Sequence, residues 1–279
     1  MTRDPTEPDR AWLVAGHGPA MIVGPERALA THAEVRARVH LAEPVADLGP
    51  VRAELSVAES GVRTFVVPWH ELPDGRMLAA HPVGANQVTW RAGAPTDMGV
   101  TPAPDGHVTD VHVRFVLRHL TTVLLEADLG GRSIHAVAAG SGSGLLAVAG
   151  PTRSGKTRLV NHLAAAGLVG EVVDDDCPVL APDGVLGTLV PRRYEVARAG
   201  CRPLRALVLL ADGATGVRRV DVVEAHRFLE RTATPWPAAW LPATGPRVLP
   251  DLPDDLNVIA VPAQDESAFA AAVELVSSL

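Results

Sequence analysis

The stretch that most constrains the fold of this chain runs from Leu145 to Thr157 and reads LLAVAGPTRSGKT. Its last eight residues fit the spacing G-x-x-x-x-G-K-[ST], and they are Gly150, Pro151, Thr152, Arg153, Ser154, Gly155, Lys156 and Thr157. The apolar run 145–149 before them predicts a buried strand. The residues after them have helical spacing, with one face formed by Leu159, Val160, Leu163 and Ala164. A strand, a glycine-containing loop and a helix in this order predict a loop that binds phosphate groups.

Each position of this loop has a chemical reason. Gly150 and Gly155 allow backbone conformations in which successive N–H groups point at an anion at the positive end of the helix. Lys156 adds a mobile positive charge for the terminal phosphates of a nucleotide. The Thr157 hydroxyl is a hard oxygen ligand that suits magnesium held between those phosphates. Gly167 occupies the position of a left-handed C-terminal cap, so the predicted helix ends there.

Three consecutive carboxylates follow the next predicted strand, Glu171 to Val173. Asp174, Asp175 and Asp176 repel one another unless a cation or a positively charged ligand lies among them. One interpretation is a solvated acidic turn. The other, which we favour, places the carboxyl end of this strand near the phosphates, because the strand follows the loop helix after a short turn and can lie beside the 145–149 strand. The carboxylates would then hold magnesium and remove a proton.

Length and composition bound the other functions. The chain has 279 residues, 47% of them apolar, and a net charge of −7. The acidic balance argues against nonspecific binding to nucleic acid or to a membrane surface. Two cysteines without metal-ligand spacing and a charged N-terminus indicate a soluble protein of the reducing cytoplasm.

The part of the chain before the loop has weaker patterns. Residues 12–23 predict two strands joined by a turn, residues 26–39 predict a helix, and four more strands are expected at 51–57, 62–67, 77–80 and 87–90. The stretch 93–106, GAPTDMGVTPAPDG, is typical of a linker or a long surface loop. We therefore expect a smaller N-terminal α+β region over 1–107, with a role in substrate recognition, and a second domain over 108–279.

The second domain is predicted to begin with a helix over 108–128. A strand over 133–139 carries His135, and Gly140 to Gly144 form a hairpin turn that leads into the strand 145–149. Further along, residues 203–210 predict a strand and residues 223–229 a helix. His135 on an apolar strand is either a hydrogen-bonded core histidine or a residue of the site.

The run from Ile134 to Asp176 resembles the C-terminal kinase domain of HPr kinase/phosphorylase and its shorter relatives. The resemblance rests on Ile134-His135-Ala136, the glycine turn, LLAVAGPTRSGKT, and the VVDDD segment. It covers about residues 110–279, although the Glu-x-Arg-Gly-x-Gly signature of HPr kinases is missing after Asp176. It implies an α/β P-loop fold of the phosphoenolpyruvate-carboxykinase and HPr-kinase type, with a mixed sheet and flanking helices.

The resemblance also implies ATP-dependent phosphorylation of a hydroxyl group. Residues 150–157 would bind the ATP phosphates, and Thr157 and Asp175 would hold Mg²⁺. Asp174 would be the general base and His135 would lie at the floor of the site, although Asp175 and Asp176 are the working pair in an alternative register. The acceptor would be a serine of a peptide or small protein, or a hydroxylated metabolite, and a homo-oligomer is plausible by the same resemblance. A nucleotide-gated interaction protein with little turnover is the other class of function that this site allows.

Overall fold

The structure is a computed structural model, and it divides the chain into two compact units. The first consists of residues 1–124 with 236–244, and the second of 125–235 with 245–279. The residues it describes are 12–16, 18–23, 27–28, 38–41, 45–46, 51–58, 64–80, 87–91, 94–101, 122–123, 126–127, 130–142, 144–186, 202–233 and 248–279. The expected boundary between residues 107 and 108 lies outside these ranges. The described chain is mixed α/β, with few helices.

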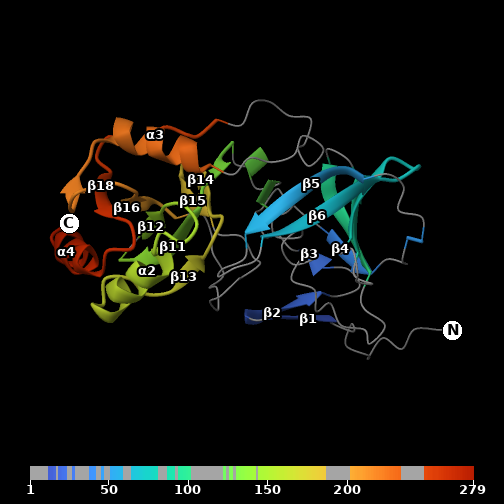
Figure 1. Ribbon diagram of the computed structural model, residues 1–279, viewed down its shortest axis with the longest axis horizontal. Helices are drawn as coiled ribbons and strands as arrows, with labels where there is room; N and C mark the ends of the chain where they lie inside the picture. The colour runs from blue at the N-terminus through green and yellow to red at the C-terminus, as the bar shows by residue number, and fades with distance from the viewer. Residues whose placement is uncertain are drawn as a thin grey trace. The chain divides into compact units, whose positions relative to one another are not determined.

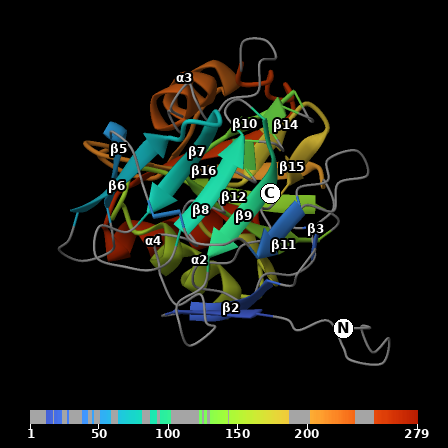
Figure 2. The ribbon, with the colours of Figure 1, turned by 90° about the vertical axis from the view of Figure 1, so that its right-hand side faces the viewer.

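The described strands of the first unit form two sheets. β1 (Trp12–Gly16) and β2 (Gly18–Val23) make an antiparallel pair, which confirms the strands predicted for 12–23. The second sheet has seven strands, seen partly face-on in Figure 2. Its order is β3 (Arg27–Ala28), β4 (Arg38–Leu41), β9 (Ala94–Thr101), β8 (Gln87–Arg91), β7 (Arg76–Ala80), β6 (Thr64–Glu71) and β5 (Val51–Ala58). The four strands predicted between residues 51 and 90 are thereby confirmed.

Two predictions for this unit are wrong in part. The helix expected over 26–39 is replaced at both of its ends by β3 and β4, where the alternation in Arg38-Val39-His40-Leu41 suits a strand. The linker expected over 93–106 contains β9, which pairs with β4 on one side and β8 on the other. Met98 is fully buried there, so sheet pairing and burial outweigh the local glycines and prolines.

The second unit is built on a six-stranded mixed sheet. Its order is β13 (Val172–Asp174), β11 (Ala136–Ser141), β12 (Gly144–Ala149), β16 (Leu204–Ala211), β18 (Asn257–Pro262) and β17 (Arg218–Arg219). β12, β16 and β18 run parallel, while β11 is antiparallel to both of its neighbours. The strands predicted for 145–149 and 203–210 and the hairpin turn at 140–144 are confirmed.

The predicted neighbour of the strand at 145–149, β12, is not the one observed. β13 does not pair with β12, because β11 lies between them. β13 nevertheless runs in the same direction as β12, since each is antiparallel to β11. The carboxyl ends of β12 and β13 therefore still meet the same edge of the sheet, two strand positions apart.

Helices cover both faces of this sheet. Figure 1 shows α3 (Val222–Thr232) on one side, and α2 (Lys156–Ala165) with α4 (Glu266–Ser277) on the other. The side chains of β12 alternate between the two layers, with Leu145, Ala147 and Ala149 on the α3 side and Leu146 and Val148 on the side of α2 and α4. This alternation is why an unbroken apolar run can be a strand: both of its faces are buried.

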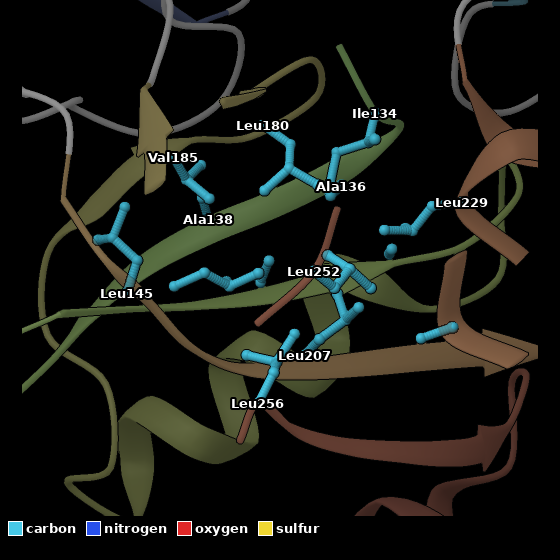
Figure 3. Close-up of a cluster of buried hydrophobic side chains, with 14 of the residues drawn as sticks. Ile134, Ala136, Ala138, Leu145, Leu180, Val185, Leu207, Leu229, Leu252 and Leu256 are labelled. Atoms are coloured by element: carbon cyan, nitrogen blue, oxygen red, sulfur yellow. The ribbon is translucent and has the colours of Figure 1, made fainter. Parts of the chain in front are cut away.

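The α3 side has further covering elements. A small sheet of β10 (Arg132–Ser133), β14 (Val179–Ala181) and β15 (Gly184–Leu186) contributes Leu180 and Val185, which lie over β11 in Figure 3. Leu252 and Leu256 pack on the same face beside Leu207. The site described below lies at the carboxyl edge of the parallel strands that these two layers hold.

The remaining helix predictions have mixed outcomes. α2 ends in a left-handed Gly167, as predicted, with Gly167 N–H donating to Ala164 O and Leu168 N–H donating to Leu163 O. α3 confirms the helix at 223–229. Of the helix predicted for 108–128, residues 122–123 and 126–127 are helical and the rest lies outside the described residues.

Candidate functional site

The loop from Gly150 to Gly155 joins the end of β12 to the start of α2 and is closely packed. A Cβ atom added to Gly150 would lie 2.7 Å from Ser154 Oγ and 2.9 Å from Leu210 Cβ. A Cβ atom on Gly155 would lie 2.8 Å from Phe269 Cζ, and Gly155 has a φ of 100°. Neither position therefore has room for a Cβ atom, and Gly155 also has a backbone conformation that favours glycine.

The Lys156 side chain turns back over the loop and is buried. Its ammonium group donates to Gly150 O at 2.9 Å and to Pro151 O at 3.0 Å, and lies 3.0 Å from His135 Nε2. The two carbonyl oxygens accept from this ammonium group, which has three N–H donors. The positive charge of Lys156 is thus held over the loop, beside two of its backbone carbonyl oxygens.

His135 lies between the loop and the acidic segment. The predicted strand over 133–139 is wrong at this point, because β10 ends at Ser133 and β11 begins at Ala136. The peptide at His135 accepts a hydrogen bond from Gly150 N–H at 3.2 Å, while its ring nitrogen Nε2 lies 3.3 Å from Asp176 Oδ1. The imidazole therefore links Lys156 to Asp176.

The three aspartates have different environments although all are buried. Asp174 Oδ1 accepts two backbone hydrogen bonds of 2.8 Å, from Asp176 N–H and Cys177 N–H. Asp174 thereby shapes the turn that follows β13. Asp176 is the aspartate that contacts His135. The structure thus brings Asp176, His135 and Lys156 together, and gives Asp174 a backbone role that the sequence did not indicate.

The loop fits a phosphate group. The first turn of α2 has no acidic residue, and no side chain caps its N-terminus. Ser154 is 2% exposed, and its hydroxyl Oγ is buried without a hydrogen-bond partner. A helix N-terminus without a side-chain cap, a neighbouring buried hydroxyl and a lysine is an arrangement that suits phosphate binding.

The candidate magnesium ligands have suitable chemistry. Thr157 is half-buried in the first turn of α2, and Asp175 is buried just beyond β13. Hydroxyl and carboxylate oxygens are the hard ligands that Mg²⁺ takes, and it completes its shell with phosphate oxygens and water. Within the part of the chain that the structure describes, no group of three histidine, cysteine or carboxylate side chains could hold a metal unaided.

Two residues of this neighbourhood were missed from the sequence. Gln264 N–H donates to Ser154 O at 2.9 Å, and the Phe269 ring packs against Gly155. Both follow β18, and Gln264 lies 110 positions after Ser154 in sequence (264 − 154 = 110). Only the parallel pairing of β16 with β12 and with β18 brings them to the loop, and no local pattern indicates that pairing.

Comparisons with known proteins do not extend this description: no family model matches the chain, and no curated protein is significantly similar to it. Among the described helices, none has both the length and the apolar character needed to cross a bilayer.

Proposed function

We propose that this protein is an ATP-dependent kinase that transfers the γ-phosphate to a hydroxyl acceptor. The second unit would then be a P-loop fold of the phosphoenolpyruvate-carboxykinase and HPr-kinase type. The observation that carries the proposal is the arrangement of Lys156, whose ammonium lies 2.9 Å from Gly150 O, 3.0 Å from Pro151 O and 3.0 Å from His135 Nε2. Lys156 lies over the loop and beside His135, and His135 Nε2 lies 3.3 Å from the buried Asp176 carboxylate.

MgATP would supply the phosphoryl group and the cation that neutralises its charge. Residues 150–157 hold the phosphates, with Lys156 moving from the loop carbonyls to the terminal phosphates and Thr157 offering its hydroxyl to the metal. This positioning is the main catalytic contribution that a protein makes to phosphoryl transfer.

The geometry favours Asp175 and Asp176 as the working carboxylates. Both lone-pair positions of Asp174 Oδ1 are used by backbone N–H groups at 2.8 Å, so Asp174 positions the turn. Asp176, beside His135, is the general base: it takes the proton of the acceptor hydroxyl as that oxygen bonds to the γ-phosphorus and the bond to ADP breaks. Asp175 keeps the role of metal ligand that the resemblance implies, so the base moves from Asp174 to Asp176.

The test is transfer of labelled γ-phosphate from ATP into an extract of candidate source cells, separated into macromolecular and small-molecule fractions. We expect label with the wild type and none with Lys156→Ala. Arg158→Ala is the matched control, because Arg158 is also a cation of α2 but is exposed and paired with Glu266 at 2.9 Å. The labelled fraction distinguishes a peptide or protein acceptor from a metabolite.

A second comparison tests which aspartate is the general base. Asp176→Asn should abolish labelling, whereas Asp174→Asn should keep it, since an amide oxygen can still accept the two backbone hydrogen bonds. Absence of transfer by the wild type, with ATP binding shown by calorimetry, would overturn the kinase proposal and favour a nucleotide-gated interaction protein.

A further inference from the structure

The turn after β18 is tied to the phosphate-binding loop. Gln264 N–H donates to Ser154 O at 2.9 Å, and Ala263 N–H donates to Ala211 O at 3.3 Å. β12, β16 and β18 are parallel, so Ala149, Ala211 and Pro262 all end at one edge of the sheet. Ligands of open α/β sheets bind outside such carboxyl ends. The turn at 262–265 is therefore a second wall of the same site.

Gln264 has an unusual backbone there. Its φ is 61°, and among the described residues the one other non-glycine residue with positive φ is Arg153, with a φ of 67°. Both adjoin Ser154, because Arg153 precedes it in the chain and Gln264 N–H donates to its carbonyl oxygen. Left-handed backbone is unfavourable for a residue with a long side chain and gathers at functional sites. Glycine would fit this conformation without cost, yet the sequence has a glutamine.

The turn at 262–265 carries a negative charge, which makes it unsuited to phosphate groups. Asp265 caps α4, with Oδ1 accepting from Ser267 N–H, Ser267 Oγ–H and Ala268 N–H, and Glu266 follows it. The hydrogen bond from the Ser267 side chain, with those of the backbone, lowers the pKa of Asp265, so its carboxylate remains charged. The Asp265 carboxylate repels phosphate oxygens, whereas Lys156 and Arg153 on the loop attract them, and Glu266 is paired with Arg158 of α2 at 2.9 Å. A nucleotide whose phosphates lie on α2 would therefore present its neutral base, rather than a phosphate, to residue 264.

We propose that Gln264 is a specificity-determining residue whose side-chain amide recognises the edge of an adenine base. The proposal rests on the nucleotide site proposed above. Gln264 is exposed, and its amide group makes no hydrogen bond to any of the described residues. A primary amide offers one donor and one acceptor side by side, which matches the amino group and ring nitrogen of adenine. Guanine presents two acceptors at the corresponding edge, so the same amide pairs less well with it.

The experiment is calorimetric titration of the full chain, in magnesium, with ATP, GTP and inorganic tripolyphosphate. The variant is Gln264→Gly, which removes the amide while keeping the left-handed backbone unstrained. We expect the wild type to bind ATP about tenfold or more tightly than GTP. Gln264→Gly should lose that preference while its affinity for tripolyphosphate stays within about twofold of the wild type. Gln264→Asn tolerates the same backbone but shortens the side chain by one methylene, and should also lose the preference.

The outcomes separate the two proposals. If the wild type binds tripolyphosphate as tightly as ATP, or if Gln264→Gly keeps the ATP preference, the role of Gln264 is refuted and the phosphate site stands. If the wild type binds none of the three ligands, the nucleotide site itself is refuted, and the role of Gln264 with it.

Discussion

Replacing Gly150 by alanine tests the packing of the loop directly. The added Cβ would lie 2.7 Å from Ser154 Oγ, 2.9 Å from Leu210 Cβ and 3.0 Å from Leu210 O. Overpacking of this kind costs about 1–3 kcal/mol. The loss of glycine entropy in the unfolded chain offsets about 0.4–1 kcal/mol of that. We expect the free energy of unfolding of the second unit to fall by roughly 1–2 kcal/mol.

The chain offers a convenient assay and a matched control. All five tryptophans lie at positions 12, 69, 90, 236 and 240, which belong to the first unit, so their fluorescence follows that unit. Far-UV circular dichroism follows α2, α3 and α4 of the second unit. With a urea m-value of about 2 kcal/mol/M, the circular-dichroism midpoint of Gly150→Ala should fall by roughly 0.5–1 M. Gly170→Ala is the control, because a Cβ atom there meets nothing within 4 Å.

We expect Gly170→Ala to unfold at the wild-type midpoint or slightly above it. Gly150→Ala should also lose binding of MgATP, because Ser154 or the end of β16 must move to admit the methyl group. If the two variants unfold at the same urea concentration, the close approach of the loop to Leu210 is wrong. If Gly150→Ala is destabilised yet binds MgATP as the wild type does, the loop is not the phosphate site.

Three further predictions follow from the same contacts. Phe269→Ala should destabilise the second unit by about 3–5 kcal/mol, because the ring is fully buried against Gly155, and the half-buried Phe228→Ala should cost less; equal urea midpoints would contradict this. Asp174→Ala should lower the free energy of unfolding by about 2–4 kcal/mol, because two buried N–H groups lose their acceptor, whereas Asp174→Asn should lower it by less than about 1 kcal/mol. Equal losses of stability in the two variants would contradict the turn-forming role of Asp174. Hydrogen bonds from Ser267 lower the pKa of Asp265 in the folded protein. The charged carboxylate therefore stabilises the fold fully above the ordinary pKa of 3.8, and this stabilisation is lost as the pH falls through the lower folded-state pKa. Urea midpoints measured by circular dichroism should fall over that pH range for the wild type and fall less for Asp265→Ala.

The sequence predicts the second unit well where one residue run decides the element. The apolar run 145–149, the helical spacing after Lys156 and the left-handed Gly167 all have local causes, and all are confirmed. Residues 26–39 and 93–106 show the opposite case. Their local composition favours a helix and a loop, but β4 and β9 pair with each other over a distance of about 60 residues (97 − 38 = 59). Pairing partners that far away leave no local signal.

The site divides in the same way. The loop residues follow from their spacing, and the identity of the three aspartates follows from their place after an apolar strand. Their division of roles does not, because it depends on which oxygen meets a backbone N–H and which meets His135. The backbone of the tight turn between Asp174 and Cys177 determines where each carboxylate lies. Three identical residues in a row give no sequence signal that distinguishes their positions.

The position of His135 could have been worked out from the hairpin. Ser141 pairs with Gly144, and each step away from that turn pairs residues whose numbers sum to 285, as in Ala136 with Ala149. The next step sets His135 opposite Gly150 (135 + 150 = 285), where Gly150 N–H donates to His135 O at 3.2 Å. Because β11 is antiparallel to both β12 and β13, its beginning meets their ends at one edge of the sheet. His135, which precedes β11, therefore lies near the residues that follow β12 and β13. The length of the hairpin, rather than any motif, places it between Lys156 and Asp176.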